Sequence, residues 1–96
     1  MISRRMLREF WEAGHAAAEA PLVAWFREAE AARWRGPTDI KRHYASASIV
    51  PGGRVVFNIK GNTIRLVVAI KYDQGIVYVR FVGTHAQYDR VDAEEV

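Results

Sequence analysis

The residues best suited to chemistry gather around His85, near the end of the chain. Histidine is the side chain whose ordinary pKa lies closest to neutral pH, so it can accept or donate a proton during a reaction. Tyr88 and Asp89 follow three and four residues later, which on a helix places them on the same side as His85. Thr84 and Gln87 have the spacing of a capping box, which predicts that a short helix begins at His85.

Positive charge is the second feature of the sequence that points to chemistry. Residues 33–71 carry eight lysines and arginines against Asp39 alone and sum to +7, whereas residues 1–32 sum to −1 and residues 72–96 to −3. A block of this kind attracts polyanions, with nucleic acid the first to consider. Charge alone leaves open the alternative that these residues form an ordinary solvated surface.

The strands that would position these cations follow Pro51. Arg54 to Lys60, Thr63 to Tyr72 and Ile76 to Thr84 are rich in β-branched and aromatic residues, and they are separated by the turn sequences Gly61-Asn62 and Gln74-Gly75. With two-residue loops, all apolar pairs fall on one face of the sheet. The expected pairs are Ile59 with Ile64, Phe57 with Leu66, Val55 with Val68, Tyr72 with Val77, Ile70 with Val79 and Val68 with Phe81.

The opposite face of this sheet is expected to be basic. Its strands offer five cations, one aromatic ring and no carboxylate, which favours binding of a polyanion. The rows are Lys60 beside Thr63, Asn58 beside Arg65 and Thr84, Val56 beside Val67 and Val82, Arg54 beside Ala69 and Arg80, and Lys71 beside Tyr78. This register delivers His85 to the edge of the basic face, close to Arg65.

Two amphipathic helices are predicted before the strands, and they would cover the apolar face. Met6, Phe10, Ala13 and Ala17 form one stripe with Leu7, Trp11 and Gly14 beside it, and Leu22, Trp25, Phe26 and Ala29 form a second. Pro21 suits the first turn of the second helix, and Gly36-Pro37 is expected to end it. Trp11 and Trp25 are interpreted as core residues rather than base-stacking platforms. A third helical turn is possible from Thr38 to Tyr44, and residues 45–51 show no clean period.

The composition limits the other possibilities. A chain of 96 residues that is 50% hydrophobic and 26% charged predicts one domain, residues 1–96. No apolar run approaches the roughly 20 residues that cross a bilayer, and no signal peptide is visible, so a cytoplasmic protein without membrane contact is expected. With no cysteine and with His15, His43 and His85 far apart, we expect no metal site and no cofactor.

RNA can be cleaved without a metal ion when its own 2′-hydroxyl attacks the neighbouring phosphate. That reaction needs a base, cations for the crowded phosphorane and an acid for the leaving oxygen. The predicted basic face with His85 at its edge supplies each type of group. An exposed histidine is more often a bystander, and it is the neighbouring Arg65 that favours the functional interpretation.

The stretch from Val56 to Asp89 resembles the HigB branch of the RelE/ParE toxin superfamily. The resemblance rests on V-F-N-I-K-G-N-x-x-R-L-V-V-x-I-x-Y followed by V-Y-V-R-F-V-G-T-H-A-Q-Y-D, about a third of the chain. The residues that carry it are Phe57, Asn58, Lys60, Gly61, Asn62, Arg65, Arg80, Thr84, His85, Tyr88 and Asp89. The helical first half is similar only in type.

This resemblance implies a toxin of a type II toxin–antitoxin pair that cuts mRNA on translating ribosomes and is silenced by a HigA-like helix-turn-helix antitoxin. It also implies a catalytic set of Lys60, Arg65, Arg80, His85 and Tyr88. Arg54, Asn58, Lys71 and Tyr78 are then expected to bind RNA. For Asn58, Asn62 and Asp89, a role in turns or orientation is the alternative to a chemical one.

The sequence therefore predicts an α+β, RelE-like domain. N-terminal helices pack on one face of a three-stranded antiparallel sheet whose central strand is Thr63 to Tyr72, and a short C-terminal helix follows. The expected activity is that of a metal-independent endoribonuclease. Two alternatives stay open, a DNA gyrase poison of the ParE type and a non-catalytic RNA- or ribosome-binding module. Whether the Glu94-Glu95 tail packs, frays or screens the cationic face is also open.

Overall fold

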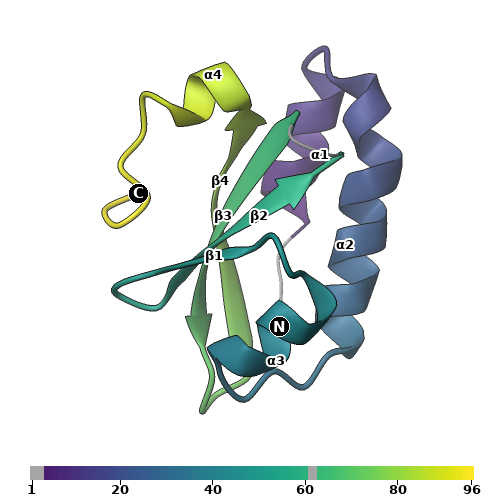
Figure 1. Cartoon of the computed structure of the whole chain (residues 1–96). Coiled ribbons are helices and arrows are strands. Elements are labelled where there is room, and N and C mark those ends of the chain that lie inside the picture. Colours follow the sequence, from purple (N-terminus) through teal and green to yellow (C-terminus); the bar gives the residue numbers. More distant parts are fainter. Residues whose placement is uncertain (1–3, 61–62) are drawn as a thin grey trace.

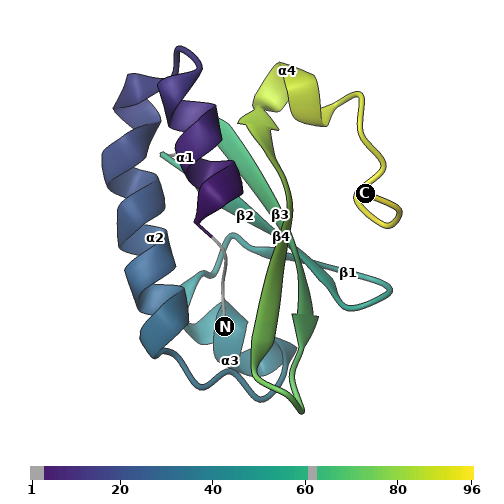
Figure 2. The ribbon, with the colours of Figure 1, turned by 180° about the vertical axis from the view of Figure 1, so that it is seen from behind.

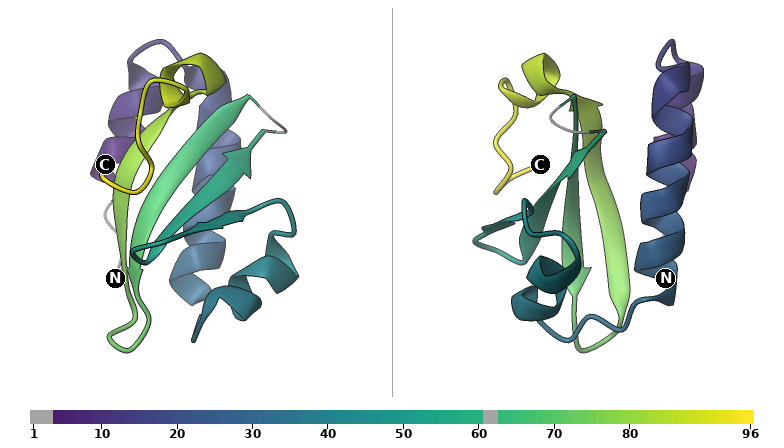
Figure 3. Two further views of the ribbon diagram at one scale, coloured as in Figure 1. Left: turned by 60° about the vertical axis from the view of Figure 1, so that its left-hand side comes forward. Right: turned by 45° about the vertical axis from the view of Figure 1, so that its right-hand side comes forward.

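The computed structural model describes residues 4–60 and 63–96. Two helices lie against one side of an antiparallel sheet, and a short C-terminal helix lies beyond its other side (Figure 1; Figure 3, right). Among the described residues, no helix combines the length and the apolar character that crossing a membrane requires. The elements in chain order are α1 (Arg5–Glu12), a 3-10 turn (Ala16–Ala18), α2 (Glu19–Ala31), α3 (Pro37–His43), β1 (Ser48–Val50), β2 (Arg54–Ile59), β3 (Ile64–Lys71), β4 (Ile76–Thr84) and α4 (His85–Tyr88).

The first two helices form where the sequence predicts them, and α2 follows its predicted stripe closely. Its four stripe residues, Leu22 to Ala29, are all buried in the core, and Pro21 lies in its first turn beside the acidic Glu19. In α1 the stripe is narrower, because the helix ends at Glu12 and Gly14, with φ 109°, turns the chain into the 3-10 turn. Leu7 and Trp11 are buried, whereas Met6, Ala13 and Ala17 are exposed and do not belong to the core.

The third helix also appears, and it begins where a helix end was expected. The second helix ends at Ala31, and Gly36-Pro37 instead starts α3, with Pro37 as its first residue, where a missing N–H is harmless. Ile40 of α3 is fully buried in the same core as the first two helices. Trp34 and Tyr44, on either side of α3, both contact the ring of Phe57, at 6.0 Å and 5.0 Å between ring centroids.

The predicted register of β2 against β3 is confirmed. Ile59 pairs with Ile64, Phe57 with Leu66 and Val55 with Val68, and all six side chains are buried against the helices. The alternation of apolar and polar residues set this register, because a slip by one residue would turn every apolar side chain to the wrong face. The two-residue loop proposed at Gly61-Asn62 lies outside the described residues.

The predicted register of β3 against β4 is wrong in two respects. The connection spans Tyr72 to Gly75 rather than Gln74-Gly75 alone, so Ile70 pairs with Val77 instead of Val79. A bulge then interrupts β4, since Val67 pairs with Phe81 while Val68 pairs with Val79, which leaves Arg80 as the additional residue.

The bulge reverses the two faces of the last part of β4. Val82 packs against the helix-covered core, and Thr84 pairs with the core residue Ile64, although both were expected on the opposite face. Phe81, expected in the core, instead shares the opposite face with Val67, and Gly83 pairs there with Arg65. A β-bulge has this effect because one additional residue shifts the alternation by one position.

The sheet has four strands rather than the three predicted. The fourth is β1, which pairs with the start of β2 through Ser48 with Val56, Ile49 with Val55 and Val50 with Arg54. It forms the edge of the sheet beyond β2, so the strand order is β1-β2-β3-β4 and β3 is central, as expected, together with β2 (Figure 2). This strand was not predicted because a segment of three residues, with Ser48 and Ile49 both exposed, shows no alternation of apolar and polar residues.

Candidate functional site

His85 is the first residue of α4, and hydrogen bonds fix the start of this short helix. The Thr84 hydroxyl accepts from the backbone N–H of Gln87 at 3.2 Å, and the Gln87 side chain accepts from the backbone N–H of Thr84 at 2.9 Å. This confirms the predicted capping box. The backbone N–H of His85 also donates to the carbonyl of Thr63 at 3.2 Å, which joins α4 to the start of β3.

The imidazole of His85 is exposed and has a carboxylate beside it. Its Nδ1 lies 3.9 Å from Oδ2 of Asp89, and the side chain of His85 is 51% exposed. A carboxylate at this position favours one orientation of the ring, with Nδ1 toward Asp89 and Nε2 directed elsewhere. Asp89 therefore suits an orienting role, and the solvent-facing imidazole is accessible to a large substrate.

Arg65 and Tyr88 meet on the face of the sheet opposite the helices, which we call the outer face. Arg65 lies opposite Asn58 and Gly83 in the strand pairing, and its guanidinium carbon is 6.0 Å from the centroid of the Tyr88 ring. The Tyr88 ring in turn lies 6.4 Å from that of Phe81. This aromatic pair limits where the Arg65 side chain can go, because a cation is attracted to the face of a ring.

Arg80 forms a second pair of a cation with an aromatic ring on the outer face. Its guanidinium carbon lies 5.4 Å from the centroid of the Tyr78 ring, and Tyr78 pairs with Ala69. Ala69 and Arg65 are four residues apart on β3, which places the row of Tyr78 about 13 Å from that of Arg65 at ~3.3 Å per residue. Arg80 lies between these two rows, at the bulge opposite Val67 and Val68. Between them, the outer face is closed by the buried side chains of Val56 and Val67.

Lys60 lies at the same end of the sheet as His85, although it is not on the outer face itself. Its carbonyl accepts from the backbone N–H of Thr63, whose own carbonyl accepts from His85. Lys60 has φ 54°, a left-handed conformation that a lysine rarely adopts. Its side chain is exposed and lines a small cavity together with His15 and Thr84.

The four expected RNA-binding residues occupy different settings. Tyr78 is 42% exposed and Lys71 is exposed, but Lys71 pairs with Ile76 and not with Tyr78 as predicted. Arg54 is half-buried and pairs with Ala69, as predicted. On the other side of Ala69 the partner is Tyr78, whereas Arg80 was predicted there. Asn58 lies opposite Arg65, and its side-chain amide donates to the carbonyl of Ser46 at 3.1 Å. That bond gives Asn58 a role in holding the chain before β1.

Phe81 and Gly83 belong to this site although neither was predicted to. A Cβ atom on Gly83 would lie 2.6 Å from Cζ of Phe81 and 2.7 Å from Oε1 of Gln87, so any other residue here would require both of these side chains to move. A glycine inside a strand often marks a bulge or a close approach of the backbone to another group. Gly83 was therefore the signal in the sequence from which this part of the site could have been predicted.

The outer face is less uniformly basic than expected. Its strands carry no carboxylate, but α4 and the chain after it lie on this side of the sheet (Figure 3, right). That segment includes the exposed residues Asp89, Asp92, Glu94 and Glu95. Its last residues fold locally, with the N–H of Val96 donating to the carbonyl of Asp92 at 2.9 Å. The acidic tail therefore stands on the same side of the sheet as the cations.

Comparison with protein families identifies the chain. Within residues 4–60 and 63–96, no three side chains of the ligating types come together in a way that could hold a metal ion. A comparison with curated proteins finds no match. The model of the HigB toxin family, described as the RelE-like toxic component of a toxin-antitoxin system, matches residues 18–91, which include α2, the whole sheet and α4. The chain therefore belongs to the HigB family of RelE-like toxins, the toxic component of a toxin-antitoxin system, for which a cognate antitoxin is the partner.

Proposed function

We propose that this toxin is a metal-independent endoribonuclease that cleaves mRNA on the ribosome, in the cytoplasm. The observation that carries the proposal is the position of His85, an accessible imidazole at the end of a face that also holds Arg65 and Arg80. Proton exchange and neutralisation of phosphate charge are the two needs of RNA cleavage by its own 2′-hydroxyl.

The proposed reaction uses only the RNA and the side chains of the chain. The 2′-oxygen attacks the adjacent phosphorus, the P–O5′ bond breaks, and the products end in a 2′,3′-cyclic phosphate and a free 5′-hydroxyl. One proton leaves the 2′-hydroxyl and one reaches the departing 5′-oxygen. His85 exchanges one of these protons, and its Nδ1 lies near Asp89, which leaves Nε2 for the substrate.

The cations of the outer face then bind and neutralise the phosphates. Arg65 and Arg80 hold the scissile phosphate and its neighbour, since guanidinium groups form paired hydrogen bonds to phosphate oxygens. Lys60, at the same end of the sheet as His85, stabilises the general base of the reaction or binds a phosphate. Tyr88 stacks on a base or donates a proton, and its ring restricts Arg65.

The remainder of the outer face extends the RNA path away from His85. Arg54 and Lys71 add positive charge toward the other end of the sheet, and Tyr78 offers a ring that is 42% exposed. An exposed ring among cations suits single-stranded RNA, because any base can stack on it. Asn58 contributes through its carbonyl oxygen or its second amide hydrogen, since one amide hydrogen is used by Ser46.

The test is the fate of RNA and DNA when the toxin is produced in cells. We expect rapid fragmentation of mRNA in the cells, with cyclic-phosphate ends at the cuts. Purified toxin added to translating ribosomes should make the same cuts when the only divalent ions present are those that the ribosomes themselves need. Intact RNA with induction of the DNA-damage response would replace this proposal by gyrase poisoning. Tight RNA binding without cleavage would replace it by a non-catalytic binding module.

A further inference from the structure

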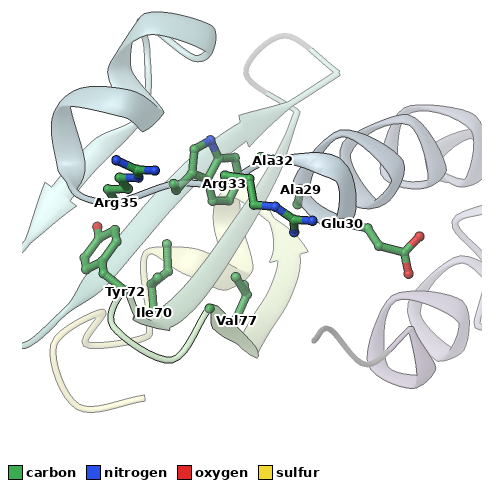
Figure 4. A pocket seen from close by; sticks show the side chains of 10 residues that line it. Ala29, Glu30, Ala32, Arg33, Arg35, Ile70, Tyr72 and Val77 are labelled. Carbon is green, nitrogen blue, oxygen red and sulfur yellow. The ribbon is translucent and has the colours of Figure 1, made fainter.

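A cavity of about 400 Å³ lies at the end of the sheet remote from His85 (Figure 4). It is bounded by the end of α2, the chain that follows α2, and the turn between β3 and β4. Ala29, Trp34, Ile70 and Val77 supply apolar walls, and Arg33 and Arg35 extend over the opening. The volume is that of a pocket for a few side chains or for one small ligand.

The cavity is separate from the outer face and from the proposed nuclease site. Ile70 and Val77 pair on the helix-covered face of the sheet, and both belong to the core. Ile64, which pairs with the residue before His85, lies six residues from Ile70 along β3. At ~3.3 Å per residue this corresponds to about 20 Å. A molecule could therefore occupy the cavity while RNA occupies the outer face.

The charges around the opening indicate the kind of partner that fits. Arg33 and Arg35 are exposed, and neither guanidinium makes a salt bridge with another described residue. Among the described residues that line the cavity, Glu30 is the one carboxylate against two guanidinium groups, so the lining has a net positive charge. Exposed guanidinium groups above apolar walls suit a protein segment that combines carboxylates with an apolar side chain.

Trp34 adds a further reason to expect a protein partner. Its ring is 8% exposed and lines the cavity, and its indole Nε1 is buried without a hydrogen-bond acceptor among the described residues. This N–H group has no accessible surface, so a partner in the cavity contacts the Trp34 ring itself, and such an aromatic wall suits an apolar side chain. RNA suits the site less well, because Glu30 and the apolar walls oppose a phosphate backbone.

We infer that this cavity is the docking site for the cognate antitoxin, which inserts an apolar side chain between the walls and places flanking carboxylates against Arg33 and Arg35. The inference rests on membership of the toxin family, which requires an antitoxin, and not on the proposed nuclease activity. The contact anchors the antitoxin on the helix-covered side of the toxin, at the end opposite α4.

The experiment measures binding of the purified antitoxin, encoded beside the toxin, by calorimetry. The double variant Arg33→Glu/Arg35→Glu reverses the rim charge, and Ala32→Phe fills the cavity from its wall. Arg8→Glu/Arg27→Glu is the matched control, since it makes the same charge change at exposed positions on α1 and α2. We expect the Kd to rise about tenfold or more for both cavity variants and to change less than about twofold for the control.

Two further readouts keep the outcomes distinct. Thermal unfolding shows whether each variant is folded, and cleavage of RNA by the free toxin shows whether the outer face is intact. An unchanged Kd for folded cavity variants would overturn the inference. Weakened RNA binding with unchanged antitoxin binding would overturn it in favour of a nucleic-acid occupant. If no variant or parent cleaves RNA, the proposed function fails while the binding result still decides the docking site.

Discussion

The guanidinium carbon of Arg65, on the central strand β3, lies 6.0 Å from the ring centroid of Tyr88, the last residue of α4. This contact joins the sheet to the helix that carries His85. It depends on the bulge at Arg80, which places Phe81 on the outer face beside Tyr88. The bulge therefore couples the position of the Arg65 guanidinium on the sheet to the position of the helix that carries the His85 imidazole.

Replacing His85 by alanine should abolish proton exchange without removing the phosphate-binding cations. We expect the single-turnover rate of mRNA cleavage to fall about 10²–10⁴-fold. RNA affinity should change by less than about twofold, since it depends mainly on charge. The control is His43→Ala, at an exposed position at the end of α3. Unchanged single-turnover cleavage by the His85 variant would contradict its assigned role.

The ring of Tyr88 should matter more for RNA binding than its hydroxyl, because the ring is what meets Arg65 and Phe81. We expect Tyr88→Phe to keep RNA affinity within about twofold and Tyr88→Ala to weaken it about 5–10-fold, as for the loss of one cation–ring or base-stacking contact. Fluorescence anisotropy with a short labelled RNA measures both. Equal affinities of the two variants would exclude a role for the ring, and their cleavage rates show whether the hydroxyl donates a proton.

An alanine at Gly83 should disturb the site through packing alone. Its Cβ would lie 2.6 Å from Cζ of Phe81 and 2.7 Å from Oε1 of Gln87, so the ring and the capping side chain must both move. We expect the free energy of unfolding to fall by about 1–3 kcal/mol, as is usual for overpacking, and cleavage to fall with it. Gly36→Ala is the control, because a Cβ there meets no atom within 4 Å. Similar unfolding midpoints in urea for the two variants would show that the close contact is absent.

Alkaline pH should destabilise the fold through Tyr44. Burial, and then the hydrogen bond to Glu28 with the charge of that carboxylate, raise the pKa of Tyr44 above its ordinary value of about 10. The unfolded chain therefore releases the Tyr44 proton at a pH where the folded chain retains it. Stability that is present below pH ~10 is lost as the pH rises toward the folded-state pKa. Urea denaturation between pH 8 and 11 should show a shallower decline for Tyr44→Phe than for the parent, whereas Tyr78→Phe, at an exposed position, should follow the parent. Parallel declines for all three proteins would show that Tyr44 does not contribute.

Several features of the site could be predicted from the sequence because they depend on neighbouring residues alone. The stripe of Leu22 to Ala29, the capping box of Thr84 with Gln87, and the register of β2 with β3 all follow from local spacing. The proximity of His85 to Asp89 belongs to the same group, since four residues span one helical turn.

The remainder was decided by the tertiary structure. Pairing Ile70 with Val77 or with Val79 leaves the same side chains on the same face, so the apolar pattern cannot distinguish the two registers. The choice depends on how the turn between β3 and β4 closes and on where the bulge at Arg80 gives the best packing of Val82 in the core. The short strand β1 pairs with the edge of β2, a contact between separate segments that no local period indicates. Sequence spacing alone thus determined the buried stripe of α2, the capping box and the register of β2 with β3, because these depend on local periodicity. Packing between distant segments decided the register of β3 with β4, the face that the end of β4 presents and the position of the acidic tail.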